Sequence, residues 1–152
     1  MAGVALWLLA VGTELALGAW AFRQAGAQGA VLLAIMLNGL VCLRFAVTLR
    51  RGGLPLITRY ARADSAGLPA EGEAYTRRLT AIWTMLLGLF AIAQAGPLLG
   101  LWSTRAVSLT EAIACVALFL GEHVQRNRSL PQLGRATPWR TLRAIWGSYR
   151  VA

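Results

Sequence analysis

The sequence of 152 residues contains no lysine, one histidine and only six acidic residues. Charged residues make up 14% of the chain, whereas a soluble domain usually has about 25%. The single histidine, His123, excludes a histidine-rich metal site. The two cysteines, Cys42 and Cys115, lack the close spacing of a metal or redox motif. We therefore expect neither a metal nor another cofactor.

Familiar catalytic patterns are also missing from the sequence. It contains no P-loop, no GxGxxG, no GxSxG and no HExxH motif. With few serines and one histidine, the chain has little material for a catalytic triad. The sequence therefore favours a protein that is not an enzyme. A membrane acyl- or glycosyl-transferring enzyme stays open as an alternative, with Glu122 or His123 as its base.

Apolar residues, 57% of the chain, are concentrated in four runs at about 3–22, 29–49, 79–101 and 107–124. At 1.5 Å per residue, each run is long enough to cross roughly 30 Å of hydrocarbon. Buried helices of a soluble bundle would need a charged outer face, and these runs have almost none. The sequence therefore predicts a single all-α domain, an integral membrane four-helix bundle spanning 1–152.

The distribution of arginine predicts how the chain is oriented. All fifteen basic residues are arginine, and the net charge is +9. Only Arg23 and Arg105 lie in the two short loops, and the other thirteen lie in or near the long loop 50–78 and the tail 125–152. By the positive-inside rule, this asymmetry predicts a bacterial inner-membrane protein with both ends and the long loop in the cytoplasm. Membrane orientation explains the basic charge, so we expect no nucleic-acid partner.

Two segments outside the apolar runs have amphipathic helical patterns. Pro55 stands at a plausible first helical position, and the segment 54–62 predicts a short loop helix lying on the membrane surface. A second helix should begin at Pro69, continue into the third apolar run and weaken at Gly96-Pro97. In the tail, aromatic and aliphatic residues recur at helical spacing over 138–149. That pattern predicts an interfacial helix in contact with anionic lipid headgroups.

Four polar residues, Glu14, Asn38, Gln94 and Glu111, fall in the outer halves of the apolar runs. Together they predict one polar layer within the bundle. Ionisable groups in membranes are costly, so the layer can be the proton or substrate site of a small transporter or flippase component, which would need to form a homo-oligomer. The alternative is interhelical hydrogen bonding that fixes the packing. The absence of a basic partner at this depth favours the second reading.

A second cluster is predicted at the inner boundary of the membrane. It consists of Arg44, Glu122, His123 and Arg126, and an Arg44–Glu122 pair would neutralise both charges near the headgroups. Glu122 and Arg126 also have the i, i+4 spacing of an ion pair within one helix. The cluster faces the arginine-rich loop, where an anionic headgroup or an acyl carrier protein can approach.

Several motifs carry a family resemblance over about 55–126. The segment from Pro55 to Arg62 reads PLITRYAR, and it is followed by Leu68-Pro69, by YTRRLT over 75–80 with Trp83, and by Gly121-Glu122 with Arg126. In this combination the chain resembles the small bacterial membrane proteins encoded in aryl polyene and xanthomonadin-type pigment clusters. His123 departs from the pattern, because the family usually has an aromatic residue directly after the glutamate that matches Glu122.

Genes of that family lie beside genes for acyl carrier proteins, ketosynthases, a ligase, acyltransferases and exporters. The resemblance therefore implies a role in making, handing over or anchoring a polyene acyl chain. On this basis we expect an accessory protein that docks acidic, acyl-carrier-dependent partners at the membrane. Arg59, Arg62, Arg77 and Arg78 are the predicted partner-binding residues, because they lie on the resembling segment and face the cytoplasm.

Overall fold

The computed structural model describes residues 2–64 and 68–130, together with positions 137, 139, 141, 143, 145 and 146 of the tail. Before residue 28, side chains are described only at positions 20, 23 and 26. The described part of the chain contains helices and no strand, as predicted. Its elements are α1 (Ala2–Thr48), α2 (Leu56–Asp64), α3 (Ala70–Ala93), the 3₁₀ helix η1 (Gly96–Leu99) and α4 (Thr104–Ser129).

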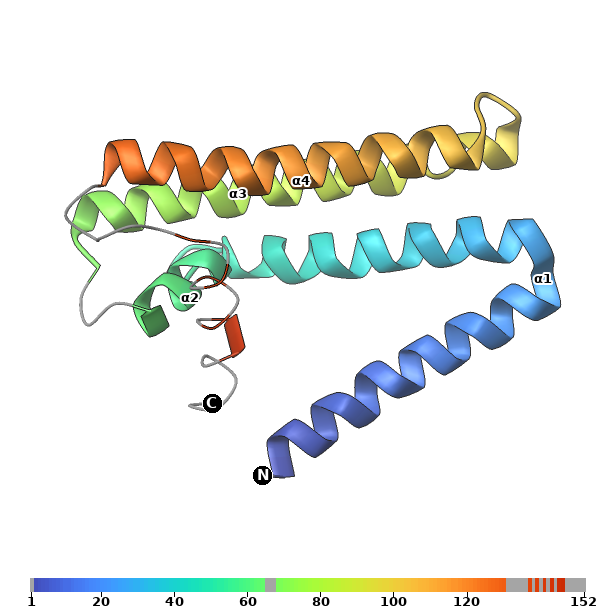
Figure 1. The fold of residues 1–152 in the computed structure, drawn as a ribbon, viewed down its shortest axis with the longest axis horizontal. Helices are drawn as coiled ribbons and strands as arrows, with labels where there is room; N and C mark the ends of the chain where they lie inside the picture. The colour runs from blue at the N-terminus through green and yellow to red at the C-terminus, as the bar shows by residue number, and fades with distance from the viewer. Residues whose placement is uncertain are drawn as a thin grey trace.

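Three segments of the described chain are long and apolar enough to cross a membrane: Gln28–Thr48, Ala70–Leu99 and Thr104–Ser129. They correspond to three of the four predicted runs and run lengthwise beside one another (Figure 1). The first run, 3–22, is helical, but its role as a fourth span stays a prediction.

The outward faces of these helices are apolar, which distinguishes them from helices of a soluble bundle. On α4, a stripe of five aliphatic side chains at helical spacing is more than half exposed. A soluble protein would place charged groups on such a face, whereas lipid accepts it without cost. The described structure is therefore compatible with a membrane protein. The stripe consists of Leu109, Ile113, Val116, Leu120 and Val124.

Helix α1 bends at a single residue, which lies between the first two predicted apolar runs. The sequence predicted separate helices over 3–22 and 29–49, with Arg23 in a short loop between them. In the structure the break is shorter, because α1 is helical on both sides of Gly26, which alone leaves helical geometry at φ 58° and ψ −140°. Positive φ is easily adopted by glycine, so one residue is sufficient to redirect the chain. The two limbs of α1 open as a V (Figure 1), so the N-terminal limb does not lie alongside the second one along its whole length.

The turn between α3 and α4 confirms the predicted weak point at Gly96-Pro97. Helix α3 ends at Ala93, and η1 carries Pro97 in its first turn. The indole Nε1 of Trp102 donates a hydrogen bond to the Ala93 carbonyl oxygen at 3.0 Å. The indole ring lies against Gly96, where an added Cβ would come within 2.2 Å of it. Only glycine fits under this ring.

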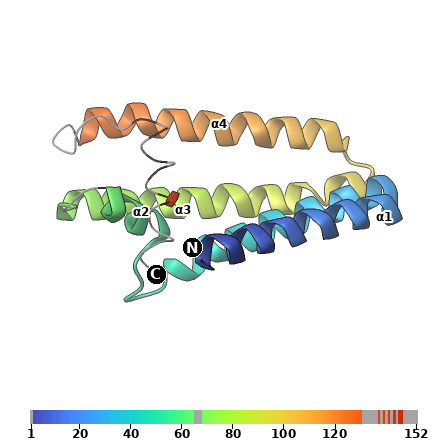
Figure 2. The ribbon, with the colours of Figure 1, turned by 60° about the horizontal axis from the view of Figure 1, so that its bottom comes forward.

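Helix α2 is present as predicted, but it packs against the first turns of α3 (Figure 2). Its side chains Leu56, Thr58 and Ala61 are buried. The Thr58 hydroxyl is 2.7 Å from the hydroxyl of Thr76 on α3, and the backbone N–H of Ile57 donates to Thr80 Oγ1 at 3.4 Å. Hydroxyl groups on α3 thus hold α2 in place by hydrogen bonds, in addition to any contact of α2 with lipid headgroups.

Candidate functional site: a cavity at the arginine-rich end

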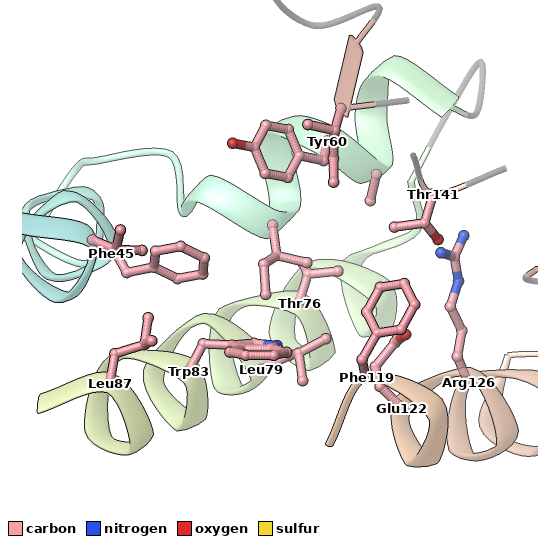
Figure 3. Close-up of a pocket in the computed structure, with 14 residues that line it drawn as sticks. Phe45, Tyr60, Thr76, Leu79, Trp83, Leu87, Phe119, Glu122, Arg126 and Thr141 are labelled. Carbon is pink, nitrogen blue, oxygen red and sulfur yellow. The ribbon is translucent and has the colours of Figure 1, made fainter. Parts of the chain in front are cut away.

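A cavity of about 260 Å³ lies at the end of the molecule that carries α2 (Figure 3). Every described helix except η1 contributes to its wall, and so does the tail. The lining residues are Val41 and Phe45 of α1; Ile57, Tyr60 and Ala61 of α2; Thr76, Leu79, Trp83 and Leu87 of α3; Phe119, Glu122 and Arg126 of α4; and Thr141 and Ile145 of the tail.

Most of this wall is apolar and aromatic. Phe45, Trp83 and Phe119 approach the cavity from three different helices, and Leu79 and Leu87 complete its floor (Figure 3). The residues come together because α3 presents positions 76, 79, 83 and 87, at three- and four-residue spacing, along one face. Such a surface favours an extended apolar ligand, and flat aromatic walls favour a flat one.

The two charged groups of the lining, Glu122 and Arg126, lie at one end of the cavity together with the Thr141 hydroxyl, and this end is called the polar end (Figure 3). Behind them His123 is buried, with 5% of its surface exposed. Its Nε2 lies 3.0 Å from the Thr141 hydroxyl, and its Nδ1 lies 3.1 Å from a Glu122 carboxylate oxygen. A carboxylate, an imidazole and a hydroxyl are thus in contact in series, and the carboxylate and the hydroxyl line the cavity.

The protonation pattern of His123 follows from its partners. Nδ1 is 2.7 Å from the carbonyl oxygen of Phe119, one helical turn earlier. A carbonyl can only accept a hydrogen bond, so Nδ1 carries a proton. In the neutral imidazole Nε2 is then an acceptor, and the Thr141 hydroxyl donates to it. Glu122 lies beside the same Nδ1–H and favours this tautomer.

The exposed arginines of the loop come from the same short segments as the cavity wall. On α2, Arg59 and Arg62 are exposed, while Ile57, Tyr60 and Ala61 line the cavity. On α3, Arg77 and Arg78 are exposed between Thr76 and Leu79, which also line it. The predicted partner-binding residues are therefore sequence neighbours of residues that line the cavity, and they lie on the same two helices, α2 and α3.

Two of these four arginines also hold the fold together. Arg62 forms an ion pair with Glu73 of α3, which ties α2 to the start of that helix. Arg77 Nη2 donates to the Leu49 carbonyl oxygen at 2.7 Å, just beyond the end of α1. A lysine at position 77 would lose the guanidinium N–H that makes this contact. Arg59 and Arg78 are exposed on the same surface and are the better probes of partner binding.

The structure describes three members of the predicted polar layer and links two of them. Gln94, 1% exposed, donates from Nε2 to a Glu111 carboxylate oxygen at 2.8 Å, joining α3 to α4. Asn38 is buried but donates to Ala34 of its own helix at 3.1 Å. The side chain of Glu14 lies outside the described residues. The Gln94–Glu111 contact is the interhelical hydrogen bond expected of a layer that fixes packing.

The inner-boundary cluster is centred on α4. A Glu122 carboxylate oxygen lies beside the Nδ1–H of His123, and Arg126 acts on the same carboxylate electrostatically from one turn away. Arg44 is exposed on α1. The sequence did not predict Thr141 as a member, although it is the residue that brings the tail to this cluster. Its only sequence signal is its place on the predicted amphipathic tail helix, eighteen residues after His123.

Metal-ligating side chains do not gather in this part of the molecule. Among the side chains that the structure describes, no group of three from His, Cys, Asp or Glu is placed to hold a metal ion. The site is built from an apolar cavity together with a hydroxyl, an imidazole, a carboxylate and a guanidinium.

Comparison with family models, with curated proteins and with solved structures finds no match to this chain. Function is therefore inferred from the geometry of the cavity and from the sequence.

Proposed function

We propose that this chain receives an apolar acyl chain from a soluble acyl carrier at the cytoplasmic face of the bacterial inner membrane. One observation carries the proposal: α2 and the start of α3 supply both the exposed arginines and part of the cavity wall. A carrier docked on the arginines would hold its prosthetic arm close to the cavity. The protein then acts as an accessory acceptor that keeps an insoluble chain out of water.

The shape and chemistry of the cavity fit such a cargo. Its aromatic walls, Phe45, Trp83 and Phe119, suit a flat conjugated chain, and its polar end suits a carbonyl group. This agrees with the role implied by the resemblance to proteins of aryl polyene clusters, where acyl chains grow on carrier proteins. A polyene acyl chain is thus the cargo we propose.

Electrostatics supports an acidic docking partner. The loop and tail arginines create a positive surface, which speeds encounter with acidic proteins and makes the rate depend on salt. In the described structure this surface includes Arg59 and Arg78, both exposed. Anionic lipid headgroups are attracted by the same charge, and they hold the tail and α2 at the membrane.

The docking proposal is tested by measuring carrier binding in nanodiscs. The double variant Arg59→Glu, Arg78→Glu should bind an acidic acyl carrier protein about tenfold more weakly, mainly through slower association at low salt. Arg105→Glu, an exposed arginine at the opposite end of α4, is the matched control and should bind like the parent. Equal binding by the parent and the double variant would remove the docking surface from the proposal.

The proposed topology has four spans, with both ends in the cytoplasm. Reporter fusions after Arg62 and at the C-terminus should read cytoplasmic, and a fusion after Gln28 should read periplasmic. The arginine asymmetry supports this orientation. An external reading after Arg62 would place the cavity on the wrong side for a cytoplasmic carrier.

A further inference from the structure

The polar end of the cavity contains the components of an acyl-transfer site. A nucleophile, a base and an orienting carboxylate need hydrogen-bond contacts of roughly 2.6–3.2 Å in series. Thr141 Oγ1 to His123 Nε2 is 3.0 Å, and His123 Nδ1 to Glu122 is 3.1 Å. The series ends on a hydroxyl that lines an apolar cavity.

We propose that Thr141 accepts the acyl group covalently, with His123 as its general base. This rests on the proposed function, because it takes the delivered cargo to be an acyl thioester seated with its chain in the cavity. The Phe119 carbonyl and Glu122 hold the proton on Nδ1, so Nε2 is free to take the proton of the Thr141 hydroxyl.

The step is balanced without any further reactant. The Thr141 oxygen attacks the thioester carbonyl carbon, so a C–O bond forms and the C–S bond breaks. The hydroxyl proton passes to His123 Nε2 and then to the departing sulfur, which leaves as the free thiol of the carrier arm. The product is an acyl ester on Thr141, which a second hydroxyl compound or water can release by the reverse proton path.

Arg126 is placed to assist this reaction. Its guanidinium points to the same end of the cavity as Thr141 (Figure 3). During the attack the carbonyl oxygen gains negative charge, and a guanidinium beside it stabilises that charge where water is excluded. The apolar walls hold the chain, so that binding and chemistry depend on different residues.

The test uses the full chain in nanodiscs with a long-chain acyl-pantetheine thioester as the probe. Release of thiol is followed with a thiol reagent, and ester formation is followed by intact mass and by its removal with hydroxylamine. The parent should gain one acyl mass at Thr141. Thr141→Val, which keeps the size of the side chain, should lose the adduct. Thr141→Ser should keep it.

His123→Gln separates a catalytic base from a structural residue. Glutamine can still hydrogen-bond Thr141, but it cannot take a proton at neutral pH, so thiol release should fall by about 10²–10⁴-fold. Thr110→Val, an exposed threonine on α4 far from the cavity, should react at the parent rate. His123→Gln should still bind a non-reactive acyl amide as tightly as the parent, whereas a merely structural role of His123 would lower binding and thiol release together.

Binding is measured in parallel with a non-reactive acyl amide of the same chain length. If the parent and Thr141→Val both bind the amide but the parent forms no ester, the transfer step is overturned and the proposed carrier role stands. If the parent does not bind the amide, the proposed function fails as well. Thiol release by Thr141→Val at the parent rate would equally overturn Thr141 as the acceptor.

Discussion

The packing of α2 on α3 provides a quantitative prediction, because it depends on the hydrogen bond between two buried hydroxyl groups. Thr76 lies 2.9 Å from the Gly72 carbonyl oxygen and 2.7 Å from the Thr58 hydroxyl. Each hydroxyl has one proton, and the carbonyl can only accept. Thr76 therefore donates to Gly72, and Thr58 donates to Thr76. Thr58 is 1% exposed, so neither group can turn to water instead.

Valine substitutions at the two threonines, measured as a double-mutant cycle, should reveal which hydroxyl donates and which accepts. Thr58→Val removes one neutral hydrogen bond and should cost about 0.5–1.5 kcal/mol. Thr76→Val leaves the Thr58 hydroxyl buried with a lost acceptor and should cost about 1–3 kcal/mol. The double variant, with both hydroxyls replaced by methyl groups, should cost about 1 kcal/mol less than the sum of the two single changes.

The assay is reversible unfolding in mixed micelles, combined with hydrogen exchange of the α2 amides, because α2 should open before the spans do. Thr110→Val on the exposed face of α4, where the hydroxyl bonds only to its own helix, is the control and should change stability little. Strict additivity of the Thr58 and Thr76 variants, or unchanged exchange in α2, would refute this account of the packing of α2 on α3.

Three further changes test other contacts of the fold. Gly96→Ala should lower stability by about 1–3 kcal/mol in a thermal melt, because the new methyl group displaces the Trp102 ring; an unchanged melting temperature would contradict the close fit. Glu111→Leu should cost about 1–3 kcal/mol by stranding the buried Gln94 amide, while Glu111→Gln should be tolerated; equal effects would argue against that bond. Arg77→Lys should cost about 0.5–1.5 kcal/mol through its lost bond beyond the end of α1, whereas Arg78→Lys at the neighbouring exposed position should not; indistinguishable variants would show that both act only through charge.

Much of the helical framework could be predicted because membrane crossing imposes a simple requirement on sequence. A run of about twenty apolar residues is needed for each span, and three runs became helices of that length. Helix starts and ends were also readable, since Pro69 precedes α3 and Pro97 follows it. The sequence indicated a break between the runs 3–22 and 29–49, but the break is confined to Gly26. The end of an apolar run shows that a helix is interrupted, but it does not show how many residues the interruption takes.

The site could be predicted only in part, since its members meet through tertiary contacts. Glu122, His123 and Arg126 are close in sequence and were recognisable as one cluster at the end of α4. Thr141 joins them across eighteen residues, and no local pattern specifies which face of the tail meets α4. The packing of α2 on α3 was missed for a related reason. Thr76 and Thr80, one turn apart, entered the sequence analysis only as part of the YTRRLT motif, although hydroxyl groups at this spacing can bond to another helix.

The central claim, that the cavity holds an acyl chain, is tested most directly by photo-crosslinking with a diazirine-bearing acyl chain delivered on a carrier thioester. The parent in nanodiscs should be labelled on peptides that line the cavity, including the one that contains Trp83. Leu87→Trp fills the cavity and should abolish this labelling. Met85→Trp, two residues away on the same helix and 67% exposed, should leave it intact. Equal labelling of both variants, or labelling confined to outward residues such as Ile113, would contradict the account.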